Sequence, residues 1–203
     1  MVLDELSKSL KTGFVDKELI SEKLYQPTLL VNKKNPPRKV LSTILEELKY
    51  CDEFFISVAF VTTSGVATLI NTLKELEEKG VKGKVIVSQY LNFTQPEALR
   101  KLLKFPNIEL RIATNVNSHS KGYLFRKSEY HNIIIGSSNL TASALATNKE
   151  WNLKVSALHS SDIVDKITKE FDTDFQNGTA VTESFICAYE DIYNSSFGIQ
   201  NKQ

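Results

Sequence analysis

Cysteine and the motifs that build metal centres are scarce in this chain. The 203 residues include two cysteines, Cys51 and Cys187, which are far apart and form no Cys-x-x-Cys pair. Neither a disulfide framework nor a zinc cluster is therefore expected, and both cysteines are interpreted as small buried apolar residues. The three histidines, His119, His131 and His159, are not part of a His-Glu-x-x-His motif. The sequence thus predicts no metal site and no cofactor.

Long apolar runs and an excess of one charge are also missing. No stretch approaches the ~20 apolar residues that cross a bilayer, and the N-terminus lacks the layout of a signal peptide. We therefore expect a cytoplasmic protein without a membrane partner. The formal net charge is +1 at pH 7, so binding of a polyanion must come from a local basic patch. An apolar content of 41% favours one well-packed core.

The informative part of the chain is a group of polar residues near its centre. His119 and Lys121 are two residues apart, and the run 136–139 (Gly-Ser-Ser-Asn) is followed eleven residues later by Glu150. The segment 118–126 has the alternating pattern of a strand. Side chains alternate between the two faces of a strand, so His119 and Lys121 would share one face and converge on one phosphate.

The Gly-Ser-Ser-Asn run follows an apolar segment, 131–135, that is typical of a buried strand. Gly136 allows a close approach of the backbone, and Ser138 or Asn139 can cap a helical turn over 140–145. Free N–H groups at a helix start are suited to bind a phosphate oxygen. With an imidazole, a fixed ammonium and a carboxylate, these donors form a complete set for attack on phosphorus without a metal ion.

This pattern resembles the motif of the phospholipase D superfamily, which begins His-x-Lys and continues to Gly-Ser-x-Asn. The matching residues are His119, Lys121, Gly136, Ser137 and Asn139. The surroundings of the motif are similar to the phospholipase D-like nuclease domains of restriction enzymes and bacterial helicase-type polypeptides. Glu150 falls where this nuclease branch carries an acidic residue. The motif covers 118–152, and a looser likeness extends over most of the chain.

One position departs from the superfamily pattern. The usual motif has an aspartate five residues after the lysine, where this chain has Arg126. In the related nucleases that aspartate is interpreted as a structural support, so its absence weakens a lipase assignment more than a nuclease assignment. Arg126, the adjacent Lys127 and Ser138 are expected to contact the substrate.

The resemblance implies a metal-independent phosphodiesterase, and in particular a DNA endonuclease. His119 would attack phosphorus and form a phosphohistidine, while Lys121 and Asn139 hold the non-bridging oxygens. Ser137 would add a hydroxyl contact, and Glu150 would fix the imidazole tautomer. Sites of this superfamily use two His-x-Lys motifs, and this chain has one. We therefore expect a homodimer with one composite active site, in a polypeptide that can also carry a helicase or restriction module.

Two alternatives remain open at this point. The first is a nucleic-acid-binding or protein docking module whose site has decayed, which Arg126 and the modest net charge favour. The other alternative is a phospholipid phosphodiesterase, although no lipid-facing amphipathic stretch stands out in the sequence.

The order of elements predicts an α/β protein, an α/β/α sandwich with a mixed, largely parallel sheet. Residues 1–36 are expected to form a helical and extended appendage, and 37–203 a phospholipase D-like catalytic domain that also fits a fragment of a longer polypeptide. Helices are predicted at 3–12, 17–24, 40–50, 64–79, 95–103, 162–176 and 182–193. Strands are predicted at 53–60, 83–89, 108–113, 118–126, 131–135 and 150–156, with a loop at 115–118.

Overall fold

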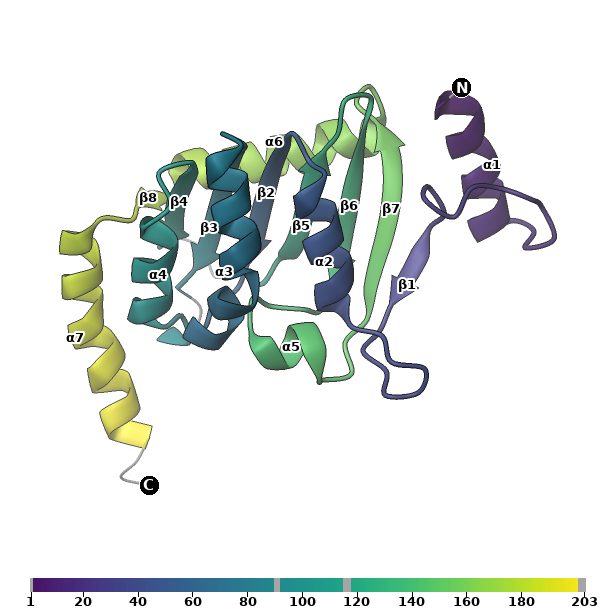
Figure 1. The fold of residues 1–203 in the computed structure, drawn as a ribbon. Coiled ribbons are helices and arrows are strands. Elements are labelled where there is room, and N and C mark those ends of the chain that lie inside the picture. Colours follow the sequence, from purple (N-terminus) through teal and green to yellow (C-terminus); the bar gives the residue numbers. More distant parts are fainter. Residues whose placement is uncertain (1, 90–91, 115–117, 201–203) are drawn as a thin grey trace.

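The computed structural model describes residues 2–89, 92–114 and 118–200, and it has one mixed sheet covered by helices on both faces (Figure 1). The strand order in the sheet is β1-β7-β6-β5-β2-β3-β4-β8. The strands are β1 (Thr28–Leu30), β2 (Glu53–Val58), β3 (Lys82–Ser88), β4 (Ile108–Ala113), β5 (Lys121–Arg126), β6 (Tyr130–Gly136), β7 (Asn152–Leu158) and β8 (Thr179–Ala180). The helices are α1 (Val2–Phe14), α2 (Val40–Lys49), α3 (Thr63–Glu78), α4 (Pro96–Leu103), α5 (Ala142–Ala146), α6 (Asp162–Asn177) and α7 (Glu183–Gln200).

The α/β class and the mixed sheet are confirmed, but the sheet is less parallel than expected. Among the strand pairings within the described residues, β2–β3 and β3–β4 are parallel and the other five are antiparallel. The parallel pairs are joined by the crossover helices α3 and α4. The connection from β5 to β6 is too short for a crossover, so these two strands form a hairpin and must be antiparallel.

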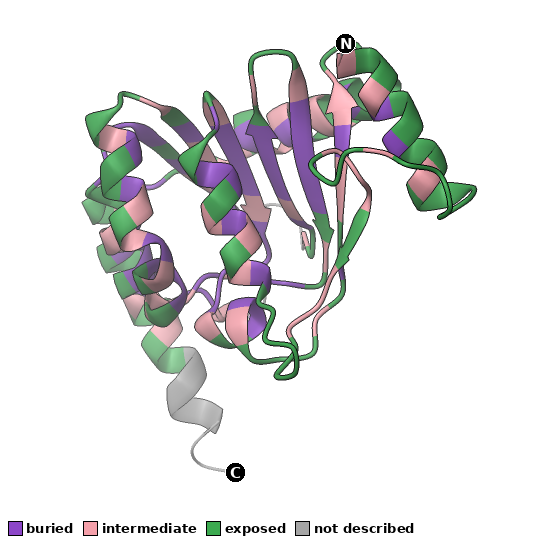
Figure 2. Ribbon diagram, turned by 45° about the vertical axis from the view of Figure 1, so that its right-hand side comes forward, coloured by how far each residue is buried: buried purple, intermediate pink, exposed green. Residues whose placement is uncertain are grey.

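Two apolar clusters, one on each face of the sheet, form the core. The larger cluster packs the sheet against α2, α3 and α4, and the smaller one packs it against α6. On β5, Tyr123 and Phe125 belong to the larger cluster and Leu124 to the smaller one, as the alternation of side chains along a strand requires. Figure 2 shows that the central strands are largely buried and that the helices expose their outer faces.

The segment 17–24 is not helical, contrary to expectation. It consists of turns and irregular backbone. The Thr12 hydroxyl donates to the Leu19 carbonyl oxygen at 3.1 Å and accepts from the Ser21 hydroxyl at 2.7 Å. Ile20 is 95% exposed, so the apolar residues of this segment have no surface on which a helix could bury them. Without such packing a short helix is only marginally stable.

The N-terminal segment contributes a strand to the sheet. β1 pairs with β7, and the Asn32 side-chain amide donates to the carbonyl oxygens of Ala144 and Asn148 at 2.8 and 2.7 Å. These contacts tie residues near the end of the expected appendage to α5 and the loop after it. The boundary between 1–36 and 37–203 stays a prediction.

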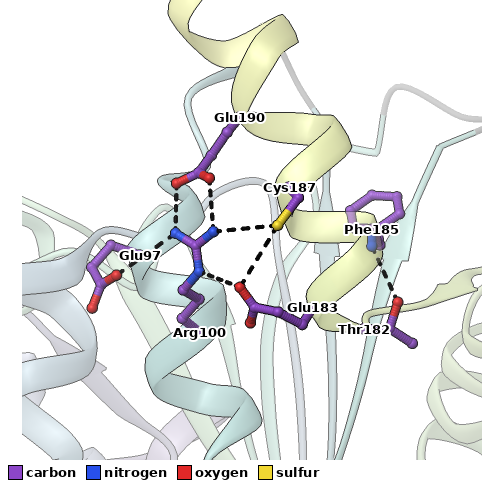
Figure 3. A network of polar contacts seen from close by, with 7 residues as sticks. All are labelled: Glu97, Arg100, Thr182, Glu183, Phe185, Cys187 and Glu190. Atoms are coloured by element: carbon purple, nitrogen blue, oxygen red, sulfur yellow. Dashed lines mark hydrogen bonds and ion pairs between the residues drawn. The ribbon is translucent and has the colours of Figure 1, made fainter.

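The C-terminal helix α7 is held to α4 by a polar cluster around Arg100 (Figure 3). The guanidinium group binds both carboxylate oxygens of Glu190, at 2.5 and 2.7 Å, and its Nε donates to Glu183 at 2.7 Å. These carboxylates raise the pKa of Arg100 above its ordinary value, through hydrogen bonds first to Glu190 and then to Glu183. The thiol of Cys187 lies beside this cluster and is exposed, so the expectation that it is buried was wrong, whereas Cys51 is buried.

No helix in the part of the chain that the structure describes combines the length and apolar character needed to cross a membrane.

Candidate active site

The candidate residues lie where β5 begins and β6 ends. The side of the sheet formed by these strand ends is called the sheet edge below. Val58 is paired with Lys121, Gly122 with Ile135, and Gly136 with Asn152, so the ends of β2, β5, β6 and β7 meet in one row. In Figure 1 this is the edge of the sheet near α5. The row gathers residues that are far apart in the sequence.

His119 and Lys121 are in direct contact. Lys121 is the first residue of β5 and is 7% exposed, whereas His119 is exposed and precedes the strand. The expected strand over 118–126 is thus shorter, and residues 115–117 of the expected loop lie outside the described residues. The Lys121 Nζ atom is 2.8 Å from His119 Nδ1 and donates to the His119 carbonyl oxygen at 2.6 Å.

The ionisation of Lys121 is altered by its position. Burial lowers the pKa of the Lys121 ammonium below its ordinary value, and the charge of the Glu150 carboxylate opposes this effect. An ammonium group can only donate, so a charged Lys121 requires His119 Nδ1 to accept, and the neutral ring then carries its proton on Nε2. Lys121 therefore selects the tautomer in this arrangement.

Ser137 and Glu150 form the next part of the site. The Ser137 hydroxyl donates to the Glu150 carboxylate through a short hydrogen bond. Two further hydrogen bonds join Ser137 to Trp151. The Ser137 N–H donates to the Trp151 carbonyl oxygen and the Trp151 N–H donates to the Ser137 hydroxyl, both at 3.1 Å. A Cβ atom on Gly136 would lie 2.2 Å from the Trp151 carbonyl oxygen, so only glycine fits there. The structure thus shows a contact of Glu150 with Ser137, and the expected role of Glu150 toward the imidazole stays a prediction.

The side chain of Asn139 is oriented by two backbone groups. Its Oδ1 atom accepts the backbone N–H groups of Ala59 and Phe60, at 3.1 and 3.3 Å, just beyond the end of β2. The residue is 7% exposed. With Oδ1 used in this way, Nδ2 is the end of the amide that can donate, as a group that binds a phosphate oxygen must.

Ser138 is held in the interior by Asn152. It is fully buried, and its hydroxyl accepts from Asn152 Nδ2 at 2.9 Å while its N–H donates to Asn152 Oδ1 at 3.2 Å. The structure thus shows a contact that supports the loop, and the expected contact of Ser138 with substrate stays a prediction. Thr141, not Ser138 or Asn139, caps the short helix α5. α5 therefore begins at Ala142 and not directly after the Gly-Ser-Ser-Asn run, as was expected.

Arg126 and Lys127 lie at the opposite end of β5, so the structure does not bring them together with these residues, and their contact with substrate stays a prediction. Arg126 is the strand partner of Glu53 and forms an ion pair with it at 3.2 Å. Lys127 forms an ion pair with the buried Glu47 at 3.0 Å. Five residues of strand separate Arg126 from Lys121, which corresponds to about 17 Å. The departure from the superfamily pattern at 126 is thus a surface ion pair remote from the site.

A cleft beside the His-Lys pair was not anticipated from the sequence. It has a volume of about 390 Å³ and is bounded by His119, Lys121 and Ile135 on the sheet and by Ile167, Glu170 and Phe171 on α6. Its walls are largely apolar, with acidic groups at the α6 rim. The periodicity of α6 indicates its apolar face, but it does not show that the α6 residues lie next to His119, because that proximity depends on packing.

His131 and His159 form a pair away from the site. Their Nδ1 atoms are 2.9 Å apart, and His131 is 7% exposed. Within the described residues, no three His, Cys, Asp or Glu side chains are grouped so that they could hold a metal ion.

The buried His131 is expected to make stability depend on pH. Burial, then the neighbouring His159 and Arg126, lower the pKa of His131 from 6.5 to about 4. The unfolded chain therefore binds a proton at His131 more tightly than the folded chain does. The free energy of unfolding is highest above pH 6.5 and falls by up to about 3 kcal/mol as the pH is lowered toward 4. Urea unfolding at several pH values should show this loss in the wild type and a flatter curve in His131→Gln. Equal slopes for the two proteins would contradict the assignment.

Comparisons with known proteins agree with this geometry. Residues 44–175 match the family described as "Cardiolipin synthase, PLD-like domain". The phospholipase D family member Nuc from Salmonella typhimurium has a similar fold, with a TM-score of 0.61 and 14% identity over 78% of this chain and 100% of that chain. NucT from Helicobacter pylori gives a TM-score of 0.58 and 17% identity, over 77% of this chain and 99% of its own.

A larger protein also contains this fold. Phosphatidylserine synthase from Haemophilus influenzae Rd KW20 has a TM-score of 0.57 and 16% identity, over 77% of this chain and 39% of that chain. No curated protein sequence matches the chain significantly. Identities this low establish a common fold, whereas the family match covers more than half of the sequence. The chain therefore belongs to the phospholipase D superfamily of phosphodiesterases, as a PLD-like domain.

Proposed function

We propose that the chain is a metal-independent phosphodiesterase that cleaves DNA through a phosphohistidine intermediate. The observation that carries the proposal is the contact of 2.8 Å between Lys121 Nζ and His119 Nδ1, on the same sheet edge as Asn139 and the Ser137–Glu150 pair. In this proposal His119 is the nucleophile, Lys121 is the cation and the Asn139 amide supplies the donors. This is the set of groups that attack on a phosphodiester needs.

In the first step, a ring nitrogen of His119 attacks phosphorus and the bond from phosphorus to the leaving oxygen breaks. Lys121 and the Nδ2 donors of Asn139 hold the non-bridging oxygens, whose negative charge grows in the transition state. A phosphate oxygen that accepts from Lys121 competes with His119 for the ammonium. Substrate binding thus draws Lys121 away from the imidazole and frees Nδ1, while Glu150 and Ser137 keep the edge of the site in place.

The acid and base for the reaction come from a second copy of the chain. The leaving oxygen takes a proton from the partner's His119, which then accepts a proton from the water that hydrolyses the phosphohistidine. A homodimer supplies this group because the chain has one His-x-Lys motif. Ile135 and Leu153, which are strand partners near the site, are 47% and 42% exposed and offer an apolar contact surface for the second copy.

A phospholipid substrate is a second candidate, supported by one feature. The apolar cleft next to His119 is large enough to take part of an acyl chain. We favour DNA because the sequence around the motif resembles the nuclease branch of the superfamily. The α6 side of the cleft carries Glu170 and Asp174 as well as Lys166, so it offers a polyanion no uniformly basic surface.

Incubation of the purified protein with plasmid DNA and, separately, with phosphatidylglycerol vesicles tests the proposal. We expect the plasmid to be nicked at an equal rate with and without EDTA, because no step uses a metal ion, and the vesicles to stay intact. Sedimentation of the same preparation should show a dimer. Hydrolysis of the vesicles alone would favour the phospholipid substrate. Cleavage of neither the plasmid, nor the vesicles, nor a single-stranded oligonucleotide would favour a docking module with a decayed site. Loss of plasmid cleavage in EDTA would rule out the metal-independent scheme.

A further inference from the structure

Aromatic side chains lie on both sides of the candidate phosphate site. On the Glu150 side, Trp151 is 63% exposed, although tryptophan is a residue that proteins usually bury for the most part. It is the single tryptophan of the chain. On the Asn139 side, Phe60 and Phe93 form an edge-to-face pair with ring centroids 5.7 Å apart, and both rings are half-buried.

The backbones of Trp151 and Phe60 are tied to residues of the site. The Trp151 N–H and carbonyl oxygen are both hydrogen-bonded to Ser137, and the Phe60 N–H donates to Asn139 Oδ1. The backbone positions of Trp151 and Phe60 are therefore set by the same bonds that shape the site, and Phe93 is linked to them through its contact with the Phe60 ring. An exposed ring on a mobile loop would not have this property.

The spacing of the strands puts Trp151 on one side of Lys121 and the Phe60–Phe93 pair on the other, near the bases that flank a phosphate bound by Lys121. Phe60 follows the end of β2, next to the strand that begins with Lys121, and Trp151 precedes β7, two strands away on the other side. With neighbouring strands about 5 Å apart, Lys121 is separated laterally by about 5 Å from one group and about 10 Å from the other. The bases on either side of a phosphate held by Lys121 fall within these distances.

We propose that Trp151 and the Phe60–Phe93 pair stack on the bases that flank the scissile phosphate, so that the preferred substrate is nucleic acid with unpaired bases. The inference rests on the proposed phosphodiesterase function and adds the substrate class. Stacking on an aromatic ring requires a free base face and tolerates every base. Bases within a duplex offer no such face, so single-stranded segments should be bound and cut in preference to paired ones.

The fluorescence of Trp151 reports the proposed contact directly. In the His119→Ala protein, which should bind without cleaving, we expect a dT12 oligonucleotide to quench the emission and an abasic oligomer of equal length to leave it unchanged. The affinity for the abasic oligomer should be lower by about tenfold or more, as the loss of one stacked base predicts. Equal quenching by both oligomers would refute base stacking.

Cleavage assays separate this inference from the proposed function. In otherwise wild-type protein, Trp151→Ala and Phe93→Ala should each raise the KM for dT12 about tenfold and leave cleavage of the abasic oligomer unchanged. The matched control is Tyr50→Ala, which removes a ring that is 65% exposed at the far end of β2. Unchanged cleavage of dT12 by both variants would overturn the inference while leaving the phosphodiesterase intact.

Two further outcomes are decisive. If the wild type cleaves neither oligomer, the proposed function itself fails. If the Trp151 emission shifts to shorter wavelength on raising the protein concentration without any oligonucleotide, a second copy of the chain covers the ring, and the stacking role is excluded.

Discussion

Replacing His119 by alanine is expected to reduce phosphodiester hydrolysis about a thousandfold or more, because the variant lacks the atom that attacks phosphorus. The same change should abolish labelling of the protein by a diester that carries radioactive phosphorus. In the wild type the label should survive alkali and be released by acid, as a bond between phosphorus and a ring nitrogen requires. The measurement is the rate of hydrolysis together with the acid lability of the trapped label.

A second histidine provides the control for this experiment. His159 is exposed and contacts His131 and the Ser128 carbonyl oxygen, away from the sheet edge that carries Lys121. His159→Ala should retain the label and most of the activity. Labelling that persists in His119→Ala, in protein whose circular dichroism matches the wild type, would assign the nucleophile to another residue.

The largest effect on stability is expected at Glu47, a buried carboxylate on α2. It is 4% exposed and binds Lys154 at 2.6 Å, Lys127 at 3.0 Å and Asn132 Nδ2 at 2.7 Å. Burial alone would raise the pKa of Glu47, but Lys154, Asn132 and Lys127 together hold it below its ordinary value. Glu47→Ala leaves two largely buried ammonium groups without a counter-charge, at a cost of about 3–5 kcal/mol.

Urea unfolding measures this loss. Glu46→Ala, which removes an exposed carboxylate from the preceding position, is the matched control and should change the free energy of unfolding by less than about 0.5 kcal/mol. A double variant, Glu47→Leu with Lys154→Met, should regain part of the stability, because it removes a buried charge together with its partner. Equal stabilities for Glu47→Ala and Glu46→Ala would mean that the buried ion cluster contributes nothing.

Features that depend on local signals could be predicted from the sequence, whereas contacts between distant residues could not. The strand at 108–113 was predicted with its observed bounds, because its apolar residues and flanking turns are local signals. Lys127 was expected to bind substrate, since a lysine near a phosphodiesterase motif offers a suitable charge. Its actual partner, Glu47, is 80 positions away in the sequence, and no local pattern reveals a contact of that range.

The same limit applies to Ser138. Its place between two motif residues suggested a substrate contact, but the Asn152 side chain, which comes from the adjacent strand, holds it in the interior. Alternation along a strand predicts which residues share a face. It does not predict what lies across from that face, because the partner strand and its register are set by packing of the whole sheet.

The sequence by itself determined the superfamily and the order of most helices and strands, because these depend on residue type and spacing along the chain. It also predicted the set His119, Lys121, Ser137, Asn139 and Glu150 as the candidate site. Only the tertiary structure decided that Lys121 contacts the imidazole, that Ser137 binds Glu150, and that Arg126 lies at the far end of β5. Each of these facts depends on distances between strands, and those distances exist only when the sheet has assembled and its two faces are covered.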